Sequence, residues 1–184
     1  MPEHDQNLAE LGDALQADLR DATGREGLRI AGTPRRLTGG FDTDTYAFDI
    51  EAAPEAEREK LVLRHYREAA GSDRPLFEST VQNAAARSGQ PVPEAPYDTT
   101  GRSLIGRAYM VMRLMPGMSL LEILMADPMG KAEMASTLLG TTQARIHDLD
   151  PGGLTRALNA ANIDTHRSDC TTIFHASRPL LGTA

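Results

Sequence analysis

The chain has 184 residues, of which 40% are hydrophobic and 24% charged, and its formal net charge is -7. This composition is typical of a soluble globular protein, and the negative charge argues against nonspecific binding to nucleic acid. The chain contains one cysteine, which excludes an intramolecular disulfide framework, and it has neither an apolar run of membrane-spanning length nor a signal-peptide pattern. We therefore expect a cytoplasmic protein that makes no contact with a membrane.

Leucines recur at helical spacing near the N-terminus, at positions 8, 11, 15 and 19. This spacing predicts an amphipathic helix over residues 7–22, ended by Gly24 and packed against the rest of the domain. Arg35 and Arg36 follow. We expect them in a solvated turn, and a role in phosphate binding is the less favoured alternative.

Two runs of alternating apolar residues predict neighbouring strands joined by the charged hairpin connection EAAPEAEREK. Their apolar-face residues are Tyr46, Phe48 and Ile50 in the first run and Leu61, Leu63 and His65 in the second. The first strand is entered through Gly39 and Gly40. Glycines can adopt positive φ and let backbone N–H groups approach an anion, which is one way in which proteins bind phosphate.

Arg64 lies in the second predicted strand, on the same face as Val62. A guanidinium among apolar neighbours needs an acidic partner or a ligand. A helix is predicted from Pro75 to the residue before Gly89, and Glu78 projects from the edge of its apolar stripe. Taken alone, such a glutamate is more often solvent-exposed, but pairing with Arg64 would solve the burial problem of both side chains.

The link PVPEAP at 91–96 cannot continue this helix, and the run from Tyr109 to Leu114 predicts a mostly buried strand that ends at Pro116 and Gly117. The pattern then changes from strands to helices. Ser119 and Glu122 have the spacing of a capping box, which predicts a short helix.

A longer helix is predicted from Lys131, ended by Pro151, Gly152 and Gly153. The last thirty or so residues are poorly patterned, and His166, Cys170 and His175 match no zinc signature, so no metal site is expected there. We therefore predict three regions. They are an N-terminal helix in 1–30, a sheet-containing lobe in 31–116 and the start of a helical lobe in 117–184.

These features follow one another in the order found in protein-kinase-like folds. In detail, the chain resembles the N-terminal part of the aminoglycoside phosphotransferase and choline-kinase-like family. The stretches that carry the resemblance, within residues 35–153, are LTGGFDTDTYAF, LVLRHYR, FESTVQNAAARSGQPVPEA, YMVMRLMPG and ARIHDLDP. The resemblance implies an α+β fold: a kinase-like N-terminal lobe of antiparallel sheet plus helix, followed by the first helices of an incomplete, truncated helical C-terminal lobe.

The resemblance also implies how the chain binds ATP or GTP. Gly39 and Gly40 resemble the loop over the nucleotide phosphates, and Val62 resembles the residue that packs on the adenine. Arg64 stands where such folds place a lysine that contacts the α- and β-phosphates, and Glu78 stands where the helix partner of that lysine lies. Arginine keeps the positive charge, but its planar fork differs in geometry from an ammonium group.

The end of the apolar strand resembles the segment that holds the adenine edge. Met112 resembles the gatekeeper residue, and the backbone of Arg113 and Met115 resembles the hinge that hydrogen-bonds the adenine. Gly117 would let the chain pass into the helical lobe.

One part of the family pattern is missing. Family members orient the acceptor hydroxyl and hold Mg²⁺ with a catalytic loop H-x-D-x-x-x-x-N and a later aspartate. No H-x-D occurs in the sequence, and His147-Asp148-Leu149-Asp150 is only a superficial echo. We therefore assign no catalytic residue and no metal ligand, although Mg²⁺ is expected for the family, and we expect little or no turnover by this chain alone.

The preferred interpretation is the nucleotide-binding part of a small-molecule phosphotransferase that uses ATP or GTP. Its acceptor would be a hydroxyl group on an aminoglycoside-like or other amine-bearing molecule, and a longer chain or a partner polypeptide would supply the missing loop. A second interpretation is a non-catalytic kinase-like module that binds nucleotide or a protein surface. A third is a remnant that folds partly and does neither.

Overall fold

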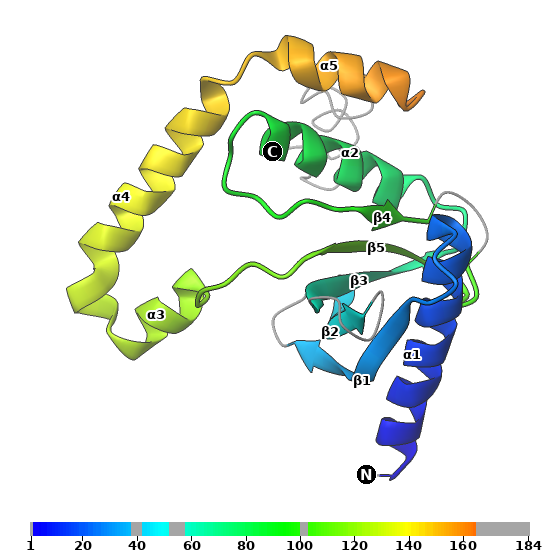
Figure 1. The fold of residues 1–184 in the computed structure, drawn as a ribbon. Coiled ribbons are helices and arrows are strands. Elements are labelled where there is room, and N and C mark those ends of the chain that lie inside the picture. Colours follow the sequence, from blue (N-terminus) through cyan, green and yellow to red (C-terminus); the bar gives the residue numbers. More distant parts are fainter. Residues whose placement is uncertain (1, 38–41, 52–57, 100–102, 165–184) are drawn as a thin grey trace, which may run out of the picture.

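The computed structural model describes residues 2–37, 42–51, 58–99 and 103–164. A five-stranded antiparallel sheet with the strand order β1-β2-β3-β5-β4 forms the centre of the N-terminal part (Figure 1). The strands are β1 (Arg29–Leu37), β2 (Thr43–Glu51), β3 (Glu59–Ala69), β4 (Tyr97–Asp98) and β5 (Arg107–Arg113). The helices are α1 (Pro2–Thr23), α2 (Arg74–Arg87), α3 (Leu120–Ala126), α4 (Pro128–His147) and α5 (Pro151–Ala160). The predicted α+β class, with an antiparallel sheet plus helices, is confirmed.

The two faces of the sheet pack against different helices, because successive side chains of a strand point to opposite faces. Leu15 and Leu19 of α1 are fully buried against Leu61 and Leu63 of β3, in a cluster that also contains Val111. The remaining buried members of this cluster are Leu28, Phe48, Ile50 and Tyr109. The amphipathic helix predicted from the leucine spacing is therefore present and covers this face.

The opposite face of the sheet carries Tyr66, Ala108 and Met110, with Met112 packed against them. Helix α2 lies over this face (Figure 1). Two amides of α2 fix the chain that follows it: Gln82 Nε2 donates to the carbonyl of Pro93 at 2.6 Å, and Asn83 exchanges hydrogen bonds of 2.9 and 2.8 Å with the backbone of Ala95.

The prediction that Arg35 and Arg36 lie in a solvated turn is wrong. They belong to β1, where they pair with Ala47 and Tyr46 of β2. The sequence did not reveal the strand because nearly all of its side chains are exposed or half-buried, so no apolar alternation marks it. Its register with β2 also shifts between Ala31 and Arg35. As an edge strand, β1 can also carry charged side chains that face solvent.

The helices after residue 117 agree with the sequence in part. The capping box is confirmed, since the Ser119 hydroxyl accepts from the Glu122 amide at 3.2 Å and the Glu122 carboxylate accepts from the Ser119 amide at 3.1 Å. The prediction that Pro151 and the two following glycines end a helix is wrong. Pro151 opens α5, and the Asp150 carboxylate caps this helix by accepting from the Gly152 amide at 3.0 Å.

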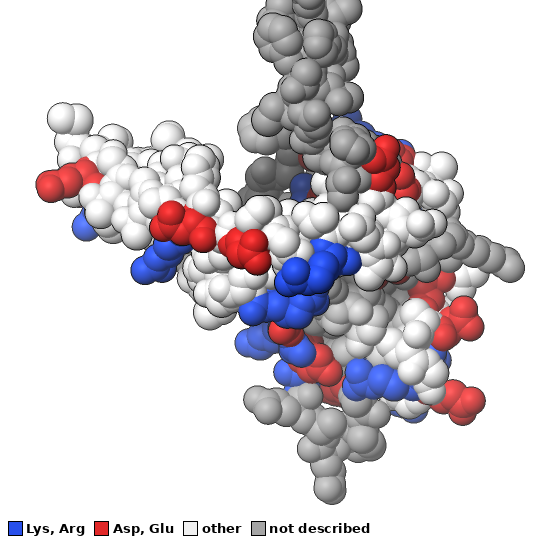
Figure 2. Space-filling view, turned by 90° about the horizontal axis from the view of Figure 1, so that it is seen from above, with Lys and Arg blue, Asp and Glu red and all other residues white. Residues whose placement is uncertain are grey.

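Helices α3 and α4 form an arm beside the sheet that exposes many apolar side chains. In Figure 2 this arm is mostly uncharged surface with a few acidic and basic groups. The exposed apolar residues of the arm and its start are Met118, Leu121, Met125, Met129, Met134, Leu138, Leu139 and Ile146. No described helix is both long and apolar enough to cross a membrane.

We predict that Leu63→Ala lowers the free energy of unfolding by about 2–5 kcal/mol, because it removes a buried side chain and leaves a cavity. Leu63 is 0% exposed at the centre of the cluster under α1. Urea unfolding followed by circular dichroism measures the loss. Leu104→Ala is the matched control, since Leu104 is 55% exposed. Equal losses in both variants would contradict this description of the core.

Candidate functional site

Arg64 of β3 and Glu78 of α2 form an ion pair on the face of the sheet under α2. The Nη1 atom of Arg64 lies 2.9 Å from Oε2 of Glu78, and both side chains are half-buried. The strand directs Arg64 to this face, and the helix that crosses it supplies the carboxylate. The contact between these two residues that was expected from the sequence is confirmed.

Tyr66 contacts both members of this ion pair, and it was not predicted as a site residue. Its hydroxyl donates to Oε2 of Glu78 at 2.7 Å, and the guanidinium of Arg64 lies 5.5 Å from the centre of its ring. Burial raises the pKa of Tyr66 far above the ordinary tyrosine value, and the hydrogen bond to Glu78 raises it further. The phenol therefore stays protonated and acts as a donor. Tyr66 lies two residues after Arg64 and on the same strand face, and this spacing could have identified it from the sequence.

Arg74, the first residue of α2, joins three carboxylates. Its Nε donates to Oε1 of Glu78 at 2.8 Å, its Nη1 donates to Glu68 at 2.9 Å, and its Nη2 donates to Asp42. These hydrogen bonds raise the pKa of Arg74 above its usual value, and the one to Asp42 has the largest effect. In turn, Arg74 lowers the pKa of the Asp42 and Glu68 carboxyl groups. The spacing of four residues between Arg74 and Glu78 could have indicated this contact.

The other residues predicted for the nucleotide site differ in where they lie relative to the pair of Arg64 and Glu78. Val62 is buried on the same strand face as Arg64 and is paired with Met112 across β3 and β5. Met112 is half-buried, and its sulfur lies 3.7 Å from Nε2 of Gln82. Gly39 and Gly40 lie outside the described residues.

The predicted hinge follows directly on β5. The Arg113 amide donates to the carbonyl of Glu94 at 2.8 Å, and the Leu114 amide donates to the carbonyl of Lys60 at 2.9 Å. Because its amide is engaged, the backbone of Arg113 can meet a ligand only through its carbonyl oxygen. Met115 is exposed. Gly117 has a φ of 130°, a backbone conformation that glycine adopts much more readily than residues with a side chain.

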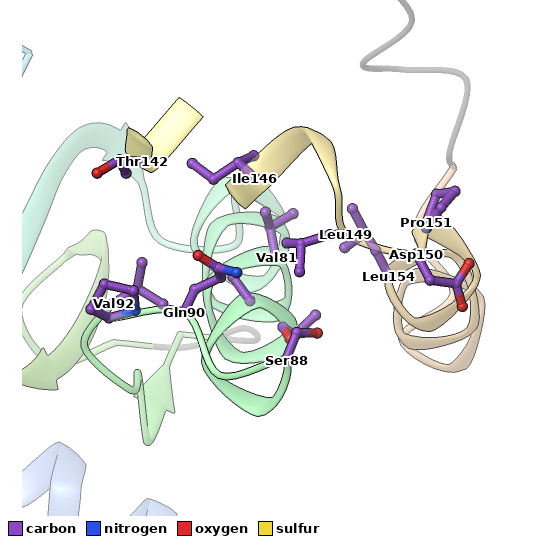
Figure 3. Close-up of a pocket in the computed structure, with 13 residues that line it drawn as sticks. Val81, Ser88, Gln90, Val92, Thr142, Ile146, Leu149, Asp150, Pro151 and Leu154 are labelled. Carbon is purple, nitrogen blue, oxygen red and sulfur yellow. The ribbon is translucent and has the colours of Figure 1, made fainter. Parts of the chain in front are cut away.

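A separate apolar cavity of about 360 Å³ lies where α2 and the chain that follows it meet the end of α4 and the start of α5 (Figure 3). Its apolar lining includes Val81, Ile146 and Leu154. Two of its polar lining residues, Ser88 and Thr142, donate to backbone carbonyls four residues earlier in the chain. None of the described residues predicted for the site lines this cavity, and its walls offer no cation to a phosphate.

Among the described residues, no group of three or more His, Cys, Asp and Glu side chains is arranged to hold a metal ion. His166, Cys170 and His175 lie outside the described residues.

The sequence also matches a known family. The model of the phosphotransferase enzyme family matches residues 33–167, more than half of the chain. The chain therefore belongs to the phosphotransferase enzyme family. The match includes Arg64, Glu78 and the hinge, and it agrees with the resemblance seen in the sequence.

A crystal structure from Ralstonia eutropha JMP134, assigned provisionally to the aminoglycoside phosphotransferases, is 24% identical in sequence, with a TM-score of 0.42. The match covers 59% of this chain and 29% of the other, so the chain spans less than a third of the length of that solved structure. No curated protein sequence matches the chain significantly.

We predict that Glu78→Gln lowers the free energy of unfolding by about 1–3 kcal/mol, because the ion pair with Arg64 and the charge on the acceptor of the Arg74 hydrogen bond are lost. Urea unfolding at neutral pH measures this loss. Glu133→Gln is the matched control, since Glu133 is an exposed helix glutamate on α4. A loss no larger than that of the control would show that the carboxylate does not stabilise the fold.

The His65 ring gives a pH prediction. Its Nε2 is buried without a hydrogen-bond partner in the described part of the chain, and burial lowers the pKa of His65 below its ordinary value of 6.5. As the pH falls below 6.5, His65 takes up a proton in the unfolded chain before it does so in the folded chain. The free energy of unfolding should therefore decrease as the pH falls from 6.5 to the folded-state pKa. Urea unfolding across this range should show the fall, and His65→Gln should reduce it. His147→Gln, at the exposed end of α4, should leave it in place.

Proposed function

We propose that the chain is the ATP- or GTP-binding part of a small-molecule phosphotransferase. The observation that carries this proposal is the ion pair between Arg64 and Glu78, in a chain that belongs to the phosphotransferase enzyme family. In kinase-like enzymes a strand cation paired with a helix glutamate contacts the α- and β-phosphates. Arg64 would take this role here.

The geometry of the pair supports this role for Arg64. In the part of the chain that the structure describes, its ion pair uses Nη1 alone, against one oxygen of Glu78. A guanidinium has five N–H donors in a planar fork, so donors remain that can reach phosphate oxygens. Gly39 and Gly40 would cover the phosphates from the side of β2 by offering backbone N–H groups.

The adenine or guanine ring would lie against Met112, which is half-buried, and its buried neighbour Val62 on the same face of the sheet. The carbonyl of Arg113 and the backbone of Met115 would bind the edge of the base. Backbone contacts of this kind are compatible with either nucleotide.

The acceptor in this proposal is a hydroxyl group of an aminoglycoside-like or other amine-bearing small molecule. The net charge of -7 favours such a cationic acceptor. Because the sequence contains no H-x-D-x-x-x-x-N loop, this chain alone would bind nucleotide with little or no turnover.

The second candidate is a non-catalytic kinase-like module that binds nucleotide or a protein. The apolar side chains exposed on α3 and α4 favour it, because a large exposed apolar surface often marks an interaction site. A phosphotransfer assay with a panel of aminoglycosides separates the two candidates, since only the first allows product to form once the missing loop is supplied.

We predict that saturating Mg-ATP or Mg-GTP stabilises the chain, by about 2.7 kcal/mol at a concentration of one hundred times Kd. Arg64→Ala should weaken nucleotide binding by about 10- to 100-fold, because a charged hydrogen bond to phosphate is lost. Thermal-shift measurement and isothermal titration calorimetry test this. Arg36→Ala is the matched control, because Arg36 is a strand arginine paired with Asp44 at the far edge of the sheet. No shift at millimolar nucleotide would overturn the proposal.

A further inference from the structure

We infer that Arg74 is a positioning residue that occupies one oxygen of Glu78 and so leaves most of the Arg64 fork available for phosphate. This inference rests on the proposed function. The starting observation is that the two oxygens of Glu78 have different arginine partners. Oε1 accepts from Nε of Arg74 at 2.8 Å, whereas Oε2 lies 2.9 Å from Nη1 of Arg64.

An arginine and a carboxylate often pair through two parallel hydrogen bonds, which would use both oxygens of Glu78 and two nitrogens of Arg64. Arg74 disfavours this arrangement, because its Nε already donates to Oε1. Tyr66 adds to the effect, because its hydroxyl donates to Oε2 at 2.7 Å. Arg64 is therefore held in place through a single nitrogen.

Arg74 is itself unsuited to bind phosphate. Each of its three nitrogens donates to a different carboxylate: Nε to Glu78, Nη1 to Glu68 and Nη2 to Asp42. Its guanidinium also lies 4.8 Å from the centre of the Tyr66 ring. The two arginines of the site thus differ: all three nitrogens of Arg74 donate to carboxylates, whereas Arg64 has one ion pair, to Glu78, and lies near the Tyr66 ring.

The place of Arg74 in the chain supports a positioning role. A cation in the first turn of a helix is opposed by the helix dipole, so its position there depends on the carboxylates around it. Those carboxylates come from the start of β2, the end of β3 and α2 itself. Asp42 lies two residues after Gly40 and directly before β2, so the Arg74 side chain connects α2 to this part of the chain.

The test compares Arg74→Ala, Arg74→Lys and Glu68→Gln with the wild-type chain by titration with Mg-ATP. Arg74→Ala should weaken binding by about tenfold, roughly the loss of one charged hydrogen bond, although Arg64 is unchanged. Arg74→Lys should fall between this variant and the wild type, because an ammonium group keeps the charge without the fork. Glu68→Gln weakens another contact of Arg74 but leaves Arg74 on Oε1 of Glu78, so its loss of affinity should be smaller than that of Arg74→Ala.

A second readout needs no nucleotide. Side-chain ¹⁵N NMR reports the rotation of the Arg64 guanidinium, which should slow in Arg74→Ala as Arg64 takes both oxygens of Glu78. Unchanged rotation would overturn the inference, as would wild-type affinity in Arg74→Ala. If the wild type binds no nucleotide, the proposed function fails, while the NMR comparison still decides how Glu78 is divided. If Arg74→Ala does not fold, the same two measurements on Arg74→Lys decide.

Discussion

The half-buried carboxylate of Glu78 is the constraint on which the rest of the site depends. It lies between two guanidinium groups and a phenol, and each of its oxygens has a distinct set of partners. Burying one charge without compensation is costly, so the cluster is stable only because opposite charges and hydrogen-bond donors meet there together. The cluster is one of the contacts that join α2 to β3.

The two faces of the sheet have different roles, which allows the charged site and the apolar core to form on the same strands. One face supplies the apolar cluster under α1, which supports the stability of the lobe, while the other carries the charged and aromatic groups under α2. Because side chains alternate along β3, Leu63 and Arg64 can serve these tasks from adjacent positions. A shift of one residue in the pairing of β3 would bury the arginine under α1 and expose the leucine.

The sequence was sufficient to predict what depends on local periodicity. Alternation identified β2, β3 and β5, leucine spacing identified α1, and the burial argument joined Arg64 to Glu78. It was not sufficient for features that arise only after folding. Strand β1 has no apolar alternation because nearly all of its side chains are exposed or half-buried. Pro151 was interpreted as a stop although Asp150 before it is a helix cap.

Arg74 illustrates the same limit in the site. Its three partners lie 32, 6 and 4 residues away along the chain, and a spacing of 32 residues has no local signal. The contact with Asp42 becomes visible only when the start of β2 and the start of α2 are brought side by side.

The hydrogen bonds from Gln82 and Asn83 have a consequence for how such a protein could be regulated. Many kinase-like enzymes turn on and off by swinging the helix that bears the glutamate. Here the corresponding helix is fastened to the segment behind it through the carbonyl of Pro93 and both backbone groups of Ala95. A swing of that kind would break all of these bonds at once, so in this chain they oppose a movement of Glu78 away from Arg64.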